Sequence, residues 1–318
     1  MKPRLESPSE IRKGNRFESA ESQSEMFYNR RDVKLSLCNE VLREFPFPEQ
    51  CRLARDFGYD GLEIAPFTLD ENPHLIPPYR ARKFHRVAAD SGISITSLHW
   101  LLAAPAGLSI NSPDAFVRGR TVEVLQGLIE LCSELGARTI VHGSPKQRSY
   151  GTTVGKAQAE ALALETFRAI ATEVEAAAIT YCIEPLSPQE TNFLNTVEES
   201  IRFCQRIGSP AFRTMLDTRA ARSIEQSSVE ELFAAWYPKG WIAHVHLNDR
   251  NRRGPGQGDD PFAPLLAEMH RQDYQEVVVV EPFDYFPDGP GAASYCAGYL
   301  RGIFETLAPR GLNGASNE

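Results

Sequence analysis

Four residues with metal-binding side chains recur in the second half of the chain: Glu184, Asp217, His246 and Glu281. Each closes a short apolar run, and successive members lie about 30 residues apart, the length of one strand plus one helix. Converging carboxylates repel one another in a water-poor site, so they need a counter-charge. Three carboxylates and one imidazole, without a thiolate, suit Mn²⁺, Mg²⁺ or Co²⁺, with Zn²⁺ as a further alternative. The predicted cofactor is therefore one divalent metal ion.

Each residue also has an ordinary structural interpretation. Asp217 stands directly before Thr218 and could cap the helix that follows it. His246 could be a core histidine, which is the commoner fate of a histidine in an apolar strand. The same four ligand types at four consecutive strand ends are harder to explain as caps, and this joint pattern favours a metal site.

Eight short apolar runs are expected to form the strands that position these residues. Their sequence ranges are 33–38, 61–65, 93–98, 138–142, 179–184, 212–217, 242–247 and 276–281. Helical periodicity predicts helices over 48–58, 112–136, 157–178, 196–208 and 292–307. The second of these should open with Ser112 and Pro113 as N-cap and first residue, and the fourth should open with a capping box of Thr196 and Glu199.

The order of these elements predicts an α/β fold, a single (β/α)8 TIM barrel. Strands such as VVVV (277–280) are apolar throughout, as expected for parallel strands that are covered on both faces. An open doubly wound sheet usually has a glycine-rich turn after its first strand, and LCNEVLREF (37–45) has none. The barrel is expected to span 33–308. Residues 1–32 read as a polar, flexible or weakly docked N-terminal extension, and 309–318 as a C-terminal tail.

Composition narrows the class of partner. The chain has 318 residues and a formal net charge of −8, so binding of nucleic acid through its phosphates is not expected. No apolar run approaches the roughly 18 residues of a membrane span, and the first residues lack the apolar core of a signal peptide. The six cysteines form no CxxC pair. A cytoplasmic enzyme without membrane partners is predicted, and self-association into a homo-oligomer stays open.

The sequence around the predicted ligands resembles a known family. The segments that carry the likeness are CIEPLSPQETNFLNT (182–196), FRTMLDT (212–218), HVHLNDRNRRGPGQGD (244–259) and VVVEPF (278–283). Together they resemble the xylose-isomerase-like barrel superfamily. Within it they are most similar to the sugar phosphate isomerase/epimerase group, which includes ketose epimerases of the D-tagatose 3-epimerase type. The likeness covers residues 33 to about 308.

The resemblance implies a mechanism and a small-molecule sugar substrate. In such epimerases the four ligands hold one metal ion, Mn²⁺ above all, which binds the carbonyl and a neighbouring hydroxyl of a keto-sugar. Two glutamates, here Glu184 and Glu281, act as acid and base through a metal-bound cis-enediolate. The chemistry is consistent with this, because a proton beside a carbonyl is weakly acidic and the developing oxyanion needs a Lewis acid. Two carboxylates on opposite faces of the carbon allow inversion.

Five further residues, and one aromatic neighbour for the last of them, are candidates for binding the substrate. Glu190 and Arg252 lie where the epimerases place a sugar-contacting glutamate and arginine. His99 and His142 end the third and fourth predicted strands, and Trp100, together with Phe67, could form a wall on which a sugar ring stacks. The chain departs from the family at Ala220, where the epimerases carry a substrate-contacting histidine three residues after the metal-binding aspartate.

Other outcomes remain compatible with the sequence. A metal-dependent lyase or dehydratase acting on a keto-sugar or keto-glycoside would use the same enolate chemistry with a leaving group. An endonuclease for apurinic sites shares the superfamily but needs histidines that Ala220 and the loop 253–260 do not supply. That glycine-rich loop leaves phosphorylation of the sugar open.

Overall fold

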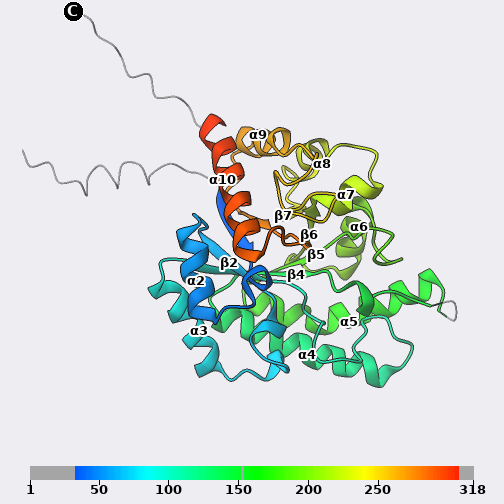
Figure 1. Cartoon of the computed structure of the whole chain (residues 1–318). Coiled ribbons are helices and arrows are strands. Elements are labelled where there is room, and N and C mark those ends of the chain that lie inside the picture. Colours follow the sequence, from blue (N-terminus) through cyan, green and yellow to red (C-terminus); the bar gives the residue numbers. More distant parts are fainter. Residues whose placement is uncertain (1–32, 152–153, 308–318) are drawn as a thin grey trace, which may run out of the picture. The chain divides into compact units, whose positions relative to one another are not determined.

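The computed structural model describes residues 33–151 and 154–307, where eight parallel strands close into a barrel in sequence order (Figure 1). The strands are β1 (Lys34–Cys38), β2 (Gly61–Ile64), β3 (Ser94–Leu98), β4 (Thr139–His142), β5 (Thr180–Ile183), β6 (Phe212–Asp217), β7 (Ile242–Leu247) and β8 (Val277–Val280). The predicted fold class is confirmed. The predicted extension 1–32 and tail 309–318 lie outside the described residues.

Each predicted apolar run contains a strand, and no strand is shorter than its predicted run by more than one residue at either end. The strands are buried on both faces, and Val278, Val279 and Val280 are all inaccessible to solvent. Pairing of β1 with β8 closes the cylinder, with Leu35 opposite Val278. A barrel of this kind has no free sheet edge, and the carboxyl ends of all eight strands meet at one rim.

Helices cover the outside of the barrel (Figure 1). They are α2 (Phe47–Asp56), α3 (Pro78–Asp90), α4 (Ala115–Glu134), α5 (Lys156–Ala176), α6 (Val197–Ile207), α7 (Thr218–Ile224), α8 (Val229–Trp236), α9 (Ala263–Arg271) and α10 (Gly289–Leu307). Short 3-10 helices are η1 (Asn39–Leu42), η2 (Pro66–Thr68), η3 (Pro73–Leu75) and η4 (Pro145–Gln147). All five predicted helices are present. No helix of the described chain is long and apolar enough to cross a membrane.

Two predicted helix starts differ in detail from the structure. The start of α4 at Ser112–Pro113 is wrong: the N-cap is Asp114, whose carboxylate accepts a hydrogen bond of 2.8 Å from the backbone N–H of Phe116. At α6, Thr196 caps the N–H of Glu199 as predicted, at 3.1 Å. The reciprocal half of the box does not form, because the Glu199 carboxylate accepts from the N–H of Asn195 instead.

The barrel interior changes from apolar to polar toward the carboxyl ends of the strands. Val141, Cys182 and Met215 form a small buried apolar cluster of their own. Two residues further toward the carboxyl ends of the strands of Cys182 and Met215 lie the buried carboxylates of Glu184 and Asp217. The six cysteines are all buried and free. The fold therefore places a layer of ionisable groups between an apolar plug and the open rim.

Candidate active site

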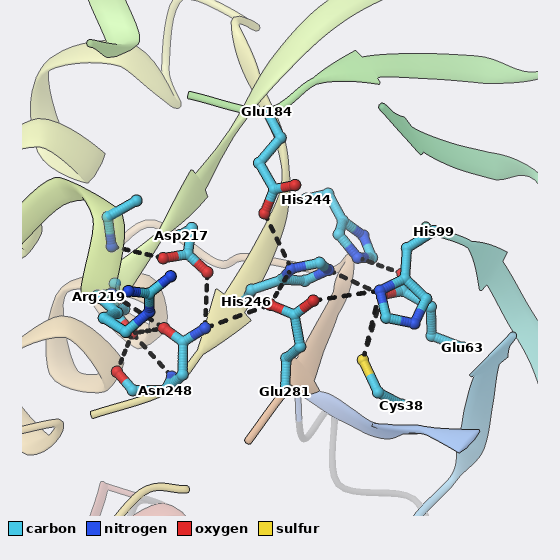
Figure 2. A network of polar contacts seen from close by, with 12 residues as sticks. Cys38, Glu63, His99, Glu184, Asp217, Arg219, His244, His246, Asn248 and Glu281 are labelled. Carbon is cyan, nitrogen blue, oxygen red and sulfur yellow. Dashed lines mark hydrogen bonds and ion pairs between the residues drawn. The ribbon is translucent and has the colours of Figure 1, made fainter. Parts of the chain in front are cut away.

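The four predicted metal-binding residues converge at the carboxyl end of the barrel (Figure 2). Glu184 directly follows β5, Asp217 ends β6, His246 lies in β7 and Glu281 directly follows β8. Each offers one ligand atom within 4.8 Å of the others, and all four side chains are buried. The alternation of side chains along a strand points all four toward the barrel axis.

His246 lies at the centre of this cluster. Its Nδ1 atom is 3.3 Å from Oε1 of Glu184 and 3.0 Å from Oε2 of Glu281. Neither ring nitrogen makes a hydrogen bond of regular geometry within the described residues. A buried imidazole nitrogen aimed at two carboxylates is the arrangement that a shared cation would satisfy.

Asp217 caps the following helix, as its position in the sequence suggested, and its second carboxylate oxygen faces Asn248. Its Oδ1 atom accepts a hydrogen bond of 2.6 Å from the N–H of Ala220 and so caps α7. Its Oδ2 atom accepts one of 2.7 Å from Nδ2 of Asn248, which also donates to Oε2 of Glu281 at 3.2 Å. Asn248 thus holds two of the carboxylates at a fixed separation.

The carboxylates strongly affect one another's charge. Burial, with repulsion from Glu184 and Glu281, raises the pKa of Asp217 to about 7. Burial also raises the pKa of Glu184. Burial opposes ionisation of Glu281 as well, but His246 and His99 outweigh it and lower the pKa of Glu281 to about 2. The protein alone therefore does not compensate all three negative charges, as expected of a site built for a cation.

A cavity of about 20 Å³ lies between these groups and is called the inner cavity here. Glu184, Asp217 and Glu281 line it, with His99 and Arg219 among its other walls. A volume of this size holds a single water-sized occupant.

Gly143, which follows β4, also lines the inner cavity and lies close against Glu184. A Cβ atom at position 143 would clash with Oε2 of Glu184. We therefore expect Gly143→Ala to displace this carboxylate and to weaken binding of Mn²⁺ by about tenfold or more. Chelator competition with Mn²⁺ measures the change, and Gly119→Ala, at a position with open space around it, is the matched control. Equal Mn²⁺ affinity in the Gly143→Ala and wild-type proteins would contradict this packing argument.

Behind His246, the carboxylate of Glu63 in β2 contacts two histidines of β7. Its Oε1 atom lies 2.8 Å from Nε2 of His246, and its Oε2 atom lies 2.9 Å from Nε2 of His244. The hydroxyl of Ser97 donates to the same carboxylate. Although burial opposes ionisation, these histidines together with His99 hold the pKa of Glu63 well below its usual range. Glu63 thus holds Nε2 of His246, so that Nδ1 of the same ring faces Glu184 and Glu281.

His99 lies between Glu281 of the cluster and Glu40, which follows β1. Its Nδ1 atom is 3.2 Å from Oε1 of Glu281, and its Nε2 atom is 3.1 Å from Oε2 of Glu40. Burial opposes protonation, but the surrounding glutamates raise the pKa of His99 well above its usual range. It lies in the wall of the inner cavity.

A second, larger cavity of about 820 Å³ opens from the rim and is called the outer cavity. Three residues, Trp100, Glu190 and Phe283, line both cavities, so the two are adjacent. Arg252 lies on the outer wall. The structure therefore brings four of the five predicted substrate contacts, His99, Trp100, Glu190 and Arg252, to these cavities.

His142 lines neither the inner nor the outer cavity. Its Nδ1 atom is 2.8 Å from the hydroxyl of Tyr181, and its ring packs edge-on against Phe167 of α5. Burial, with a smaller effect of Arg148, lowers the pKa of His142 to about 3. Its neighbour Val141 points into the barrel instead, so His142 faces the layer between sheet and helices.

Several residues of the site were not among the predicted ones: Glu63, His244, Asn248 and Arg219. The Arg219 guanidinium contacts Oε1 of Glu190 at 2.6 Å and lies 4.9 Å from the ring centroid of Phe283. Ala220, where the resemblance leads one to expect a histidine, is buried beside it. The polar residues at every second position of IAHVHLN, in an otherwise apolar strand, were the available signal for His244 and Asn248.

Comparison with known proteins agrees with this geometry. Residues 51–301 match the family of xylose isomerase-like TIM barrels. A D-psicose 3-epimerase of Agrobacterium fabrum is 27% identical over 229 residues, which cover 71% of this chain and 75% of the relative.

Two solved structures share the fold over most of the chain. A D-psicose 3-epimerase from Clostridium cellulolyticum H10, solved with D-tagatose, has a TM-score of 0.72 and 20% identity, covering 86% of this chain and 99% of the other. A 3-keto-D-glucoside 4-epimerase from E. coli has a TM-score of 0.73 and 18% identity, covering 85% and 99%. The family match spans most of the sequence, and the likeness inferred from the residues is confirmed. The chain belongs to the xylose isomerase-like TIM barrel family.

Proposed function

We propose that this protein is a divalent-metal-dependent sugar epimerase or isomerase that acts on a keto-sugar or a derivative of one. The observation that carries the proposal is the convergence of Glu184, Asp217, His246 and Glu281, whose ligand atoms lie within 4.8 Å of one another and three of which line the inner cavity. Sequence similarity to sugar 3-epimerases supports it.

The residues of the cluster fit a single divalent cation. They would hold it through three carboxylates and Nδ1 of His246, which has no regular hydrogen bond within the described chain. Oxygen-rich ligands favour Mn²⁺, with Mg²⁺, Co²⁺ or Zn²⁺ as alternatives. When bound, such an ion supplies a Lewis acid that polarises the substrate carbonyl and stabilises negative charge on its oxygen.

Proton transfer is assigned to Glu184 and Glu281. One carboxylate takes the proton from the carbon beside the carbonyl, and the other carboxyl group returns a proton to the opposite face of that carbon. These residues follow β5 and β8, which are not neighbours in the barrel, and so they reach the inner cavity from different sides. Inversion at one carbon requires this two-sided arrangement.

We assign the binding of the substrate hydroxyls to polar side chains around the cavities. Glu190 is held by Arg219 and by the hydroxyl of Ser187 at 2.7 Å, so its carboxylate is fixed for contact with a sugar. His99, Trp100 and Arg252 complete the proposed contacts. Because Ala220 offers no polar group, we assign the polar contact at that position to the neighbouring Arg219, which lines the inner cavity.

We also propose that the enzyme works in the cytoplasm, where thiols stay reduced. Its six cysteines are all free and buried, which is compatible with such a compartment.

Hydrogen–deuterium exchange tests the proposed chemistry. Protein loaded with Mn²⁺ is incubated in D2O with D-fructose, D-tagatose, D-psicose and isomaltulose, and deuterium at the carbon beside the carbonyl is followed by NMR. We expect deuterium incorporation together with an epimer or an aldose, and its loss after chelation. Loss of a substituent from the neighbouring carbon would instead indicate a lyase. No exchange with any of these ketoses would contradict the proposal.

A further inference from the structure

We propose that the outer cavity is a binding subsite for a second sugar ring, so that the substrate is a ketose that carries a sugar in glycosidic linkage. This inference rests on the proposed function, because the keto-sugar must place its reacting carbon in the inner cavity. It names the class of substrate that the epimerase chemistry would act on.

The size and adjacency of the two cavities are the first support. The inner cavity, of about 20 Å³, contains the reacting carboxylates, whereas the outer one measures about 820 Å³. The latter volume is near the upper end of the ~300–1,000 Å³ typical of pockets for drug-sized ligands. Because the inner cavity admits only a water-sized group, the reacting ketose would place its reacting carbon there and the rest of its body in the outer cavity, whose volume leaves room for a second ring. Trp100, Glu190 and Phe283 line both cavities, so a ligand at the inner cavity would lie against the wall of the outer one.

The aromatic lining of the outer cavity is the second support. Phe67 follows β2, Trp100 follows β3, and Phe283 and Tyr285 follow β8. All four rings are half-buried, so each keeps part of its surface exposed toward the cavity. Sugar rings present apolar C–H faces that pack on aromatic rings, while their hydroxyls need polar partners at the edges.

Trp100 is held in an uncommon backbone conformation. Its φ is +51°, in the left-handed region that bulky residues rarely adopt. Strain of this kind persists only where the surrounding structure enforces it, and it is concentrated at ligand clamps and active sites. This strained residue is one of the three that line both cavities.

The outer cavity wall offers polar groups of both kinds to sugar hydroxyls. It has three carboxylates, Glu40, Glu71 and Glu190, and two guanidinium groups, Arg43 and Arg252. Glu40 and Glu190 have basic partners, His99 and Arg219. The hydroxyls of a second sugar can donate to carboxylates and accept from arginines. A phosphate is the alternative ligand that the binding test compares.

Isothermal titration calorimetry on the Mn²⁺-loaded enzyme tests the subsite with three probes. These are isomaltulose, in which glucose is attached to O6 of fructose, free D-fructose, and D-fructose 6-phosphate. We expect isomaltulose to bind about tenfold more tightly than either of the others. Equal affinity for isomaltulose and fructose, no binding of isomaltulose, or tightest binding of the phosphate would overturn the subsite.

Substitutions in the wall of the outer cavity and outside it show where the second sugar binds. Phe67 lines only the outer cavity, and Phe67→Ala is expected to remove most of the preference for isomaltulose. Phe116 on α4 is 79% exposed and lies outside both cavities, so Phe116→Ala should keep the wild-type preference. Tyr285→Ala repeats the test at a second aromatic residue that lines the outer but not the inner cavity. Retention of the preference in both cavity variants would place the second sugar elsewhere and overturn the inference.

The binding and exchange experiments separate the two proposals. Tight, Phe67-dependent binding of isomaltulose without deuterium exchange into any ketose would keep the subsite and remove the epimerase chemistry. Exchange into fructose, with isomaltulose bound no more tightly than fructose, would keep the chemistry and remove the subsite.

Discussion

Glu281→Gln is expected to lower kcat/KM for turnover of a keto-sugar by about 10²–10⁴-fold. The substitution removes the carboxylate that we assign to proton transfer, and it also removes one proposed metal ligand. The two oxygens of Glu281 face different partners, since Oε1 lies near His99 and Oε2 near His246 and Asn248. An amide can accept hydrogen bonds at only one of these positions, so the effect should exceed the loss of one charge.

Steady-state kinetics with isomaltulose or D-fructose, and deuterium exchange with the same substrate, measure this loss. Glu130→Gln on α4 is the matched control, because Glu130 is exposed and lies outside the cavities. Circular dichroism shows whether the Glu281→Gln protein is folded. Wild-type turnover by the folded variant would contradict the assignment of Glu281.

Glu63→Gln is expected to weaken binding of Mn²⁺ by about 10–100-fold, although Glu63 is not one of the four proposed ligands. Its carboxylate lies 2.8 Å from Nε2 of His246, on the side of the ring opposite to the cluster. A negative charge there favours an N–H at Nε2 and leaves Nδ1 for the metal. The neutral amide loses this preference and also leaves His244 with a weaker partner.

Metal affinity by chelator competition is the measurement for this positioning role, because it does not depend on turnover. The Glu130→Gln protein again serves as the control. A purely structural role for Glu63 would lower the free energy of unfolding of the metal-free protein without changing the Mn²⁺ dissociation constant of the folded protein. That outcome would contradict the proposed role of Glu63.

The strands and the cluster were predictable because one simple pattern encodes both. Parallel strands covered on both faces read as continuous apolar runs, and a polar residue that closes such a run stands out. Glu184, Asp217, His246 and Glu281 were found in this way, and the structure brings them together. The same pattern also predicts that His142 lies near the substrate, because the pattern does not distinguish the two faces of a strand.

Register explains why His142 lies elsewhere. His142 pairs with Ile183 across β4 and β5, whereas Val141 pairs with Cys182, whose side chain lies inside the barrel. Side chains alternate between the two faces, so His142 points outward against α5. Counting in steps of two from the neighbouring strand would have shown this, but that register depends on pairing that one strand alone does not specify.

Buried positioning residues were harder to recognise. Glu63 lies within GLEI rather than at its end, and its role depends on contacts with β7, far away in sequence. The helix α3 was not predicted either. Most of its residues are polar, and its apolar stripe of Ala81, Phe84, Val87 and Ala88 is narrow, although it packs on the core.

The metal content of the purified protein, determined beside that of Glu184→Gln, tests the central claim most directly. The proposed site predicts about one ion of Mn, Mg, Co or Zn per wild-type chain and loss of that ion in the variant. Near three zinc ions per chain would point to the nuclease branch of the superfamily. No metal in either protein, even after incubation with Mn²⁺, would contradict a metal-dependent epimerase.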